Sequence, residues 1–524
     1  DFRLLSDEMN YGVPAAEALQ NLASRVPLPD VSYFVVAVLI QRESGGNLTE
    51  VLDKISGTRP ILVWHRSCHE FYLNSAAMKK FGVTKDWYDK LKGSAKEQSN
   101  FDEGHFWEQG MFAVLPLIAP AVFTPQRLDE GLHFVEEYLH ANGITVGCEP
   151  GGLLSKPLQD AQNAVFSDPS TPFRYYYIAD GKSITTAHAD DQVISETEKL
   201  LTWGQGNTAY VPKQVKLFAD GAIYSQAMQV REPYTDGHKG EWMMDLDLFE
   251  RSFRIYWDAG YQIHIHVNGD AGLDMVLNTL EKNMRRHPRY DHRTVIVHFA
   301  VSQKDQVERI QRLGAIVSAN AYYPTALADN YSKAGLGPER ANNMVRMGDV
   351  ERAGISYSYH SDMPMAPAQP LFLMHCGVNR TTQSGRVAAP EQCVSREGAL
   401  KAVTLEAAYS LQLEKEMGSI VPGKLANFTI LADNPVTCDA AKIKDIAVVG
   451  TVHEGRVFPV RHAEPKTAGI SLPEHRRPVA SSPNDRETDP DQVARISNDA
   501  TCTEGGCSCS AGRHLAELLY PPAR

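Results

Sequence analysis

Four side chains able to bind a metal or move a proton each follow a short apolar stretch of the sequence. They are Lys216 in VKLFADG, His266 in IHIHVNGD, His298 in VIVHFA and Asp362 in YHSDMP. Neutral imidazoles and carboxylates are the ligands that borderline divalent metals such as zinc prefer. One histidine at a strand end is more often a buried structural residue, but four such positions in one chain favour a metal-hydrolase site.

The segments around these residues alternate between strand-like and helix-like patterns from about 124 to 410. In one unit, Thr124 and Pro125 form a helix start, and the β-branched stretch ITVGC at 144–148 follows the helix. Such alternation predicts parallel strands joined by crossover helices, in a β/α barrel or a doubly wound sheet. No glycine-rich phosphate loop opens a first helix, which disfavours a dinucleotide-binding sheet. Polar residues at the ends of several strands favour the barrel.

The composition argues against several classes of protein. The 524 residues include 52 basic and 64 acidic side chains, and the net charge of −12 argues against nucleic acid as a partner. The segment nearest to a membrane span, at 111–123, is too short and contains two prolines. Eight cysteines are too few for a disulfide scaffold, and no secretory signal pattern follows Asp1, so we expect a cytoplasmic protein.

Both ends of the chain depart from the barrel pattern. Residues 1–57 have the spacing of helices, and residues 416–460 contain short β stretches separated by Gly and Pro turns. Residues 461–524 are rich in Pro, Ser, Arg and Asp and predict a largely irregular tail, in which three clustered cysteines form an incomplete metal-ligand pattern. The sequence therefore predicts a barrel over residues 58–415.

From about Arg59 to Phe458 the sequence resembles the amidohydrolase superfamily, specifically its amidohydrolase 3 or YtcJ-like branch. The motifs that carry the resemblance are RPILVWHRSCHEFYLNSAA (59–77), GITVGCEPGG (143–152), VKLFADG, HIHVNGD, IVHFA, HSDMP and GSIVPGKLANFTIL (418–431). The resemblance implies a distorted β/α barrel joined to a small β-sandwich. It also implies hydrolysis of C–N bonds in amides, formamides and related compounds.

The resemblance implies a metal-binding role for each of the four strand-end residues. Lys216 looks like a lysine that is carbamylated by CO2 and bridges two divalent metals, which we expect to be zinc. His266 and His298 look like the ligands of one metal, and Asp362 looks like a ligand that also acts as general base. A carbamate requires the free amine, so burial and neighbouring cations must lower the pKa of the lysine.

Four further residues are expected to contact the substrate. His69 and Asn74 match a signature that the family places near the substrate pocket. Tyr322 and Tyr323 are expected at the mouth of that pocket, although packing explains both tyrosines equally well.

The resemblance to the amidohydrolase superfamily does not extend to the N-terminal segment. The family's first barrel strand ends in His-x-His, but here the only such motif is His264–His266, on a later strand. Residues 7–23 and 34–56 instead resemble the helical domain of F-type proteins of type II and tight-adherence secretion systems, which implies a fusion. We therefore expect a barrel without its first strand, with one metal position retained and the second depleted.

The leading expectation is a metal-dependent hydrolase of small-molecule amide or N-formyl substrates, weakened by the missing histidines. The alternative is a non-catalytic chimera, or an assembly module with a remnant barrel. The sequence leaves open whether the chain forms a homo-oligomer.

Overall fold

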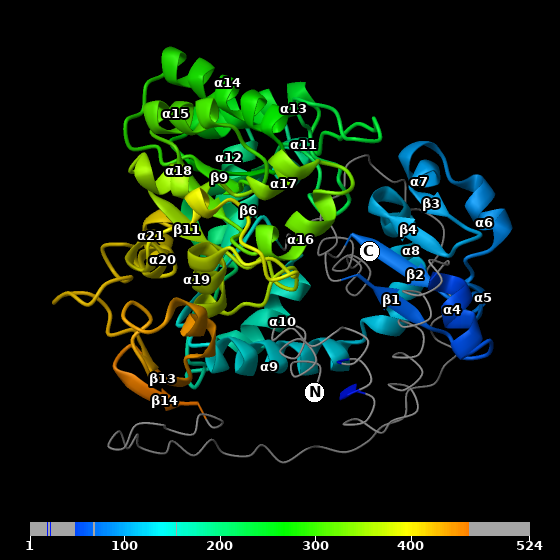
Figure 1. Ribbon diagram of the computed structural model, residues 1–524, viewed down its shortest axis with the longest axis horizontal. Coiled ribbons are helices and arrows are strands. Elements are labelled where there is room, and N and C mark those ends of the chain that lie inside the picture. Colours follow the sequence, from blue (N-terminus) through cyan, green and yellow to red (C-terminus); the bar gives the residue numbers. More distant parts are fainter. Residues whose placement is uncertain (1–17, 19–20, 23–47, 66–68, 153–154, 461–524) are drawn as a thin grey trace.

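The protein is described from a computed structural model that covers residues 18, 21–22, 48–65, 69–152 and 155–460. The expected helical segment therefore lies largely outside the described residues, and the tail with its three cysteines lies wholly outside them. A seven-stranded parallel sheet forms the centre, and two smaller antiparallel sheets flank it (Figure 1).

The parallel sheet is curled and contains its strands in chain order. The strands are β5 (Val146–Pro150), β6 (Arg174–Asp180), β7 (Thr208–Phe218), β8 (Gln262–Val267), β9 (Val295–His298), β10 (Ile316–Ala319) and β11 (Tyr357–Tyr359). Every residue of β8 and β9 is buried, as expected for parallel strands covered on both faces. The curled sheet confirms the predicted barrel-like α/β fold.

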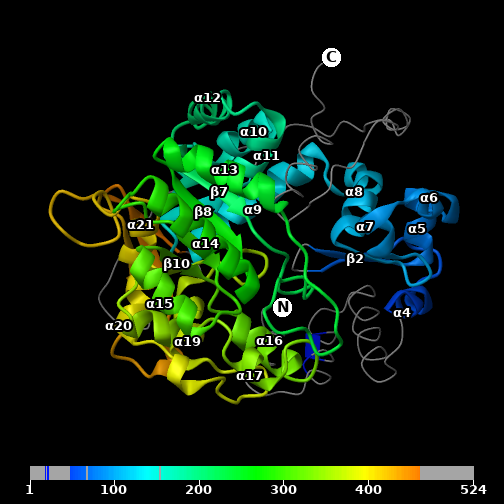
Figure 2. The same cartoon turned by 90° about the horizontal axis from the view of Figure 1, so that it is seen from above.

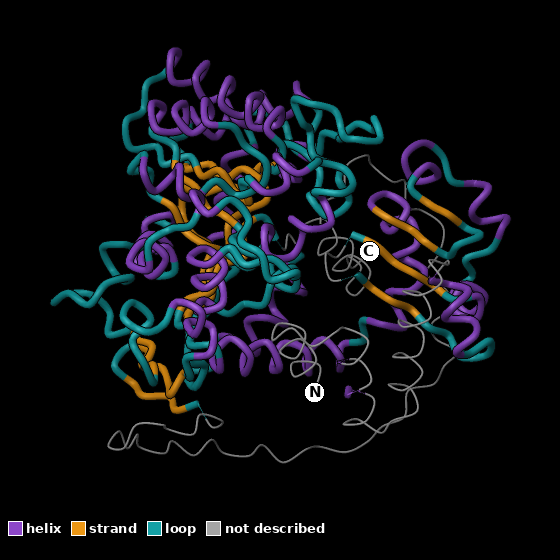
Figure 3. Tube along the Cα trace, viewed as in Figure 1, coloured by secondary structure: helices purple, strands orange, loops and turns teal. Residues whose placement is uncertain are grey.

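Helices surround this sheet in the order that the sequence alternation predicts (Figure 3). They are α9 (Pro125–Ala141), α10 (Lys156–Phe166), α11 (Gly181–Ala187), α12 (Val193–Lys199), α13 (Leu246–Asp258), α14 (Asp270–Arg286), α15 (Lys304–Leu313), α16 (Tyr323–Tyr331), α17 (Pro338–Asn342), α18 (Met347–Arg352), α19 (Pro370–Asn379), α20 (Arg396–Ala402) and α21 (Leu405–Ser410). Three short 3-10 helices lie at Leu200–Thr202, Pro390–Gln392 and Ala440–Asp445.

The core of the barrel lies between the sheet and these helices. Phe249, Phe253 and Trp257 of α13 are fully buried, as are Val276 and Leu277 of α14. Burial of each such side chain contributes about 1.5–3 kcal/mol, so the apolar stripes of the helices fix how they lie on the sheet. The strand ends that carry the polar residues are positioned by this packing.

The start of α9 follows the capping pattern that the sequence predicts. The Thr124 hydroxyl accepts a hydrogen bond from the Arg127 N–H, and Pro125 occupies the first turn. The helix ends at Ala141, and Gly143 adopts a left-handed conformation with φ 74° before β5. A side chain at Gly143 would also clash with Thr429, so glycine is required here.

A small subdomain precedes the barrel and lies beside it (Figure 2). Its antiparallel sheet has the order β1-β2-β4-β3. Its elements are α4 (Leu48–Ile55), β1 (Leu62–Trp64), β2 (Glu70–Leu73), α5 (Ser75–Phe81), α6 (Lys85–Lys90), α7 (Gly93–Glu97), β3 (Ser99–Asn100), β4 (His105–Trp107) and α8 (Glu108–Val122). The parallel barrel strands thus begin at Val146, and the residues between 58 and about 123 form a separate unit within the range we assigned to the barrel.

The helix α4 connects the described part of the N-terminal segment to this subdomain. The Thr49 hydroxyl donates to the Leu73 carbonyl at 3.1 Å, and the Ser75 N–H donates to the Asp53 carboxylate at 2.9 Å. The end of the predicted N-terminal segment is therefore packed against β2 and α5.

The third sheet is antiparallel and follows the barrel. It contains β12 (Phe428–Leu431), β13 (Val448–His453) and β14 (Arg456–Pro459), within the range predicted as a sandwich remnant. Among the described residues, no single helix is long and apolar enough to span a membrane. Within the same residues, only the pair α8 and α9, bent by 93° relative to each other, has the required combined length and apolar character.

The parallel sheet has two free edges, β5 and β11. Within the described ranges, no further parallel strand pairs with either of them. The expectation of a barrel without a strand between these edges therefore agrees with the described part of the chain.

Candidate metal centre

A cavity of ≈ 950 Å³ is lined by residues from all seven strands of the parallel sheet and contains most of the predicted site. At one end it is lined by ionisable side chains from several strands. These are His69, Glu149, Lys216, His264, His266, His298, His360 and Asp362. The lining also includes apolar side chains, among them Phe428 and Val448 of the third sheet. Parallel pairing explains the convergence: Phe218 lies opposite His266, and Val267 lies opposite His298.

His266 and His298 lie side by side, with ring centroids 4.4 Å apart. Burial lowers the pKa of both imidazoles well below the usual value, with further lowering by the positive charge of Lys216. Both rings are therefore neutral at pH 7, which is the form that binds a metal. The Asn268 side-chain nitrogen lies 3.0 Å from His266 Nε2 and orients that ring.

His298 connects the histidine pair to Asp362. Its Nδ1 lies 3.8 Å from Asp362 Oδ2 and 3.0 Å from His360 Nε2. His298 and Asp362 both adopt left-handed backbone conformations, with φ of 76° and 53°. Such conformations cost about 1–3 kcal/mol each and concentrate at functional sites, where the surrounding structure maintains them.

Asp362 is the most accessible of these groups, because 39% of its side chain is exposed. The surrounding protein nevertheless raises the pKa of Asp362 by removing water, while the positive charge of Lys216 opposes this rise. A carboxyl group with a raised pKa is better suited to accept and return a proton near neutral pH.

Lys216 is only 2% exposed and lies at the centre of the site. Among the described residues its amine makes no hydrogen bond or ion pair, and its Nζ lies 5.6 Å from the centroid of the Phe218 ring. Gly151, at φ 80°, permits the close approach, because a Cβ atom there would lie 2.6 Å from Lys216 Cγ. Lys216 also lines the cavity, beside His266 and Asp362.

The sequence analysis did not assign Glu149, at the end of β5. Burial raises its pKa to about 7, the negative charge of Asp362 raises it further, and Lys216 opposes the rise. Glu149 therefore lies within electrostatic range of the strand-end residues from β7 and β11. Its position in the motif GITVGCEPGG was the available signal, since it directly follows the predicted strand at 144–148.

His264 and His360 were also not assigned. Burial lowers the pKa of each to about 3, and each is bonded to a polar side chain: His264 to Gln214 at 3.0 Å and His360 to Ser318 at 3.1 Å. Alternation along β8 indicates that His264 points to the same side as His266. These neutral rings line the cavity beside the predicted metal ligands.

The predicted substrate-contacting residues separate into two groups. His69 and Tyr323 line the cavity, and the Tyr323 hydroxyl lies 3.4 Å from His298 Nδ1. Asn74 is fully buried outside the cavity lining, where its side chain caps α5 by accepting from the Ala77 N–H. Tyr322 also lies outside the lining and contacts Phe372, with ring centroids 5.5 Å apart.

The donor types fit a single divalent cation. Two neutral imidazoles, a carboxylate and an unpaired amine come from separate strands, and the buried Asn268 Oδ1 beside them has no hydrogen-bond partner among the described residues. Within that same part of the chain, no three His, Cys, Asp or Glu side chains are already grouped closely enough to hold an ion. The site thus has the ligand types for one cation, but among the described residues they are not arranged as a preformed coordination site.

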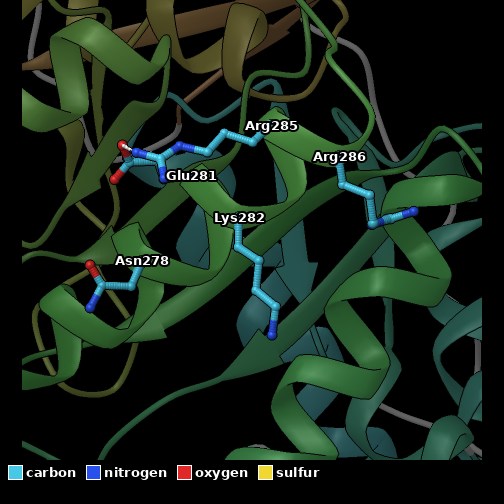
Figure 4. A pocket seen from close by; sticks show the side chains of 5 residues that line it. All are labelled: Asn278, Glu281, Lys282, Arg285 and Arg286. Carbon is cyan, nitrogen blue, oxygen red and sulfur yellow. Dashed lines mark hydrogen bonds and ion pairs between the residues drawn. The ribbon is translucent and has the colours of Figure 1, made fainter.

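A second depression, of ≈ 540 Å³, lies on the outer surface of α14 (Figure 4). Its charged side chains form solvated ion pairs, including Arg285 with Glu281 and Lys282 with Glu250. Ion pairs of this kind contribute little, typically 0–1 kcal/mol, and give no indication of a ligand.

A curled parallel sheet with candidate metal ligands at its strand ends is the arrangement found in hydrolases of the β/α-barrel class. Comparison with known proteins makes this assignment specific. The chain belongs to the amidohydrolase family (Amidohydro_3), whose profile matches residues 46–459. The match begins inside the segment of predicted secretion-system resemblance, and no comparison supports that resemblance.

Curated relatives include the putative amidohydrolase YtcJ of Bacillus subtilis, 25% identical over 78% of this chain and 75% of the relative. The N-substituted formamide deformylase of Arthrobacter pascens is 23% identical over 77% of this chain and 74% of the enzyme. A solved metal-dependent hydrolase from Pyrococcus horikoshii shares the fold, with a TM-score of 0.59, 20% identity, and coverage of 76% of this chain and 77% of the other.

Proposed function

We propose that the protein hydrolyses C–N bonds of small amide or N-formyl substrates with the help of one divalent cation, for which zinc is the expected metal. The observation that carries this proposal is the convergence of Lys216, His266, His298 and Asp362 on one cavity. Membership of the amidohydrolase family supports the hydrolytic chemistry, and the formamide-deformylase relative supports the substrate class.

Each residue has a separate task in this proposal. His266 and His298 hold the cation as neutral imidazoles, and Lys216 joins them as an amine or, after reaction with CO2, as an anionic carbamate. When bound, the cation lowers the pKa of a water ligand to near 7 and polarises the substrate carbonyl. Asp362 accepts the proton from the attacking water and returns it to the leaving nitrogen. His360 and Tyr323, both in contact with His298 Nδ1, keep its ring oriented.

The direct test is metal analysis combined with an assay of the 524-residue chain. The protein is loaded with Zn²⁺ and incubated with a panel of N-substituted formamides and acetamides, and released amine and carboxylate are measured. We expect slow turnover that stops on addition of a chelator and returns with Zn²⁺. Turnover that a chelator leaves unchanged would refute the metal-based proposal.

The alternative, a non-catalytic chimera, is supported by one observation, namely the free edges of β5 and β11 in the described part of the chain. In that case the cavity binds a cation without turnover. The same experiment separates the two functions, because metal content and product release are measured on the same sample.

A further inference from the structure

The small subdomain has a hydrophobic core of its own. Phe71 of β2, Phe106 of β4 and Leu115 of α8 are fully buried in it, together with Met111 and Ile118. Among the described residues, the buried side chains of this core and those of the barrel core form two separate clusters. Units with separate cores and a polar contact surface are expected to move relative to each other.

A two-residue link, Phe123–Thr124, joins this subdomain to the barrel. On one side α8 belongs to the subdomain core, and on the other Leu132 of α9 packs with Phe166 and Phe173 of the barrel. The two helices are bent by 93° relative to each other. Phe123, with φ −108° and ψ 76°, lies outside the helical range, and Thr124 caps α9. Residues at the ends of elements can absorb the backbone rotation of a hinge.

Two hydrogen bonds, which we call the latch, hold the subdomain against the barrel. The Ser225 hydroxyl donates to one carboxylate oxygen of Glu108, and the Gln98 side chain donates to the Glu241 carboxylate at 3.3 Å. Glu108 and Gln98 belong to the subdomain, whereas both partners belong to the segment between β7 and α13. The other oxygen of Glu108 lies 2.9 Å from His69 Nδ1, within the subdomain. Water can replace either latch bond when the two units separate.

The barrel half of the latch is anchored to the parallel sheet. The Asp220 carboxylate, at the start of that segment, is fully buried and accepts hydrogen bonds from the backbone N–H groups of Asn268 and Gly269, each at 2.8 Å. The Glu241 N–H donates to the Ala227 carbonyl, also at 2.8 Å. Because this half is fixed to the barrel, breaking the latch releases the subdomain.

The subdomain also forms part of the cavity wall. Trp64 of β1 lines the cavity, as do Ala222 and Ile223 of the segment that carries the latch. The Trp64 ring packs against Phe71 of the subdomain core and Phe123 of the link, with ring centroids 5.1 and 5.6 Å apart. A rotation at the link therefore moves this part of the wall away from the barrel.

We propose that the subdomain is a hinged lid over the metal centre, which turns about Phe123–Thr124 when the two latch bonds break. The latched arrangement places Trp64 in the cavity wall, and the opened one widens the entrance for small molecules. This inference goes beyond the proposed hydrolysis and does not depend on it, because the lid controls access to the cavity whether or not a reaction follows.

The rate at which Cys148 is alkylated measures access to the cavity, which this residue lines. The 524-residue protein is stripped of metal and treated with N-ethylmaleimide, and labelled peptides are quantified by mass spectrometry. Ser225→Ala removes one latch bond, and Glu241→Ala removes the other. Each variant should raise the labelling rate of Cys148 about threefold or more, because less energy is needed to open the lid. Cys438, outside the cavity lining, should react at an unchanged rate.

A second readout follows the subdomain itself. In protein labelled with 5-fluorotryptophan, the ¹⁹F resonance of Trp64, assigned with Trp64→Phe, reports the contact with Phe123. Ser225→Ala should shift this resonance or broaden it by exchange between two positions on the microsecond-to-millisecond timescale of hinge motions. The resonances of Trp203 and Trp257, which pack in the barrel core, should stay unchanged.

Ser195→Ala is the matched control, because this exposed hydroxyl bonds to the nearby Gln192 carbonyl, away from the latch, and its loss should leave both rates unchanged. Equal Cys148 rates in the latch variants and wild type would refute the lid. An equal rise at Cys148 and Cys438 would show general loosening of the fold and refute it as well. Both experiments use metal-free protein without substrate, so a failure of the proposed hydrolysis leaves their outcome unaffected.

Discussion

The two sides of the cavity differ in how their polar residues are held. On the β7–β9 side, each strand pairs with neighbours on both sides, and Lys216, His266 and His298 are at most 5% exposed. On the β5–β11 side, the edge strands lack a second partner among the described residues, and Asp362 is 39% exposed. The candidate ligands on fully paired strands are thus buried, whereas the carboxylate of Asp362, beyond the edge strand β11, is partly exposed to solvent.

The largest effect is expected on the paired side. His298→Ala removes one of few metal-binding groups, so we expect loss of most bound zinc and of at least about 10²-fold in kcat/KM. Metal content by mass spectrometry and kinetics on the same sample check this. His287→Ala, an exposed histidine near Asp258, is the control and should keep its metal. Equal zinc content in His298→Ala and wild type would exclude His298 as a ligand.

Adding a strand that pairs with the open edges of the sheet should raise kcat/KM by a factor similar to the loss expected for His298→Ala. Replacing residues 1–45 with a family N-terminus that carries a strand ending in His-x-His leaves α4 in place and supplies two imidazoles and a partner for the edges. Preorganised charge of this kind contributes about 10²–10³-fold per group. Steady-state kinetics should show that gain, and the same graft with both histidines changed to alanine should not. Equal gains in the two grafts would assign the effect to strand pairing alone.

Substitution of Lys216 tests whether its amine is required for metal binding. Lys216→Arg keeps the positive charge but cannot form a carbamate, so we expect about tenfold or greater loss of zinc affinity and no response to added bicarbonate. Lys213→Arg, an exposed lysine on the same strand, is the matched control. Zinc titration followed by calorimetry measures both variants. Wild-type affinity in Lys216→Arg would show that this residue does not bind the metal.

The raised pKa of Glu149 predicts how the stability of the metal-free protein depends on pH. The native carboxyl titrates at about 7 and the unfolded one near 4.3, so between these values the native state binds more protons. This residue's contribution to stability is therefore present at acidic pH and is lost as the pH rises toward 7. Glu149→Gln should be more stable than wild type at pH 8 by on the order of 1 kcal/mol or more, with a smaller difference at pH 4.5.

Chemical denaturation of both proteins in chelator at the two pH values measures this difference. Glu198→Gln, an exposed residue paired with Lys213, serves as the control and should show no such pH-dependent gain. A constant difference between Glu149→Gln and wild type at both pH values would contradict the raised pKa.

The smallest effect concerns Asn74 in the subdomain. Its side chain caps α5 and donates to the carbonyls of Ser56 and Arg59, so Asn74→Ala should cost about 1–2 kcal/mol of stability. Because Asn74 does not line the cavity, KM should change less than twofold. Thermal unfolding and kinetics of the variant check this, and a large rise in KM without loss of stability would restore the substrate-binding role.

The fold and the paired half of the site were predictable from the sequence because each depends on local patterns. Strand–helix alternation determined the parallel sheet, and the position of His266 and His298 at strand ends followed from it. Glu108 was not predictable, because its role depends on contacts with His69 and Ser225, residues 39 and 117 positions away. Asn74 matched a motif, but a signature cannot distinguish a helix cap from a substrate contact.

The separate subdomain was missed for a related reason. Its strands are two to four residues long, too short for a periodic pattern, and they are assembled by antiparallel pairing across 45 residues. Glu149 was missed because its significance depends on the charge of Asp362, which the folded sheet brings into electrostatic range.

The zinc stoichiometry of the 524-residue chain tests the central claim most directly. The protein is stripped with chelator, titrated with Zn²⁺ and followed by calorimetry, with metal bound after gel filtration counted by mass spectrometry. We predict roughly one zinc per chain, held by the His266 and His298 side of the cavity and absent in His298→Ala. Two tightly bound zinc ions per chain would contradict the proposal that the cavity binds a single cation. Retention of no zinc would contradict it equally.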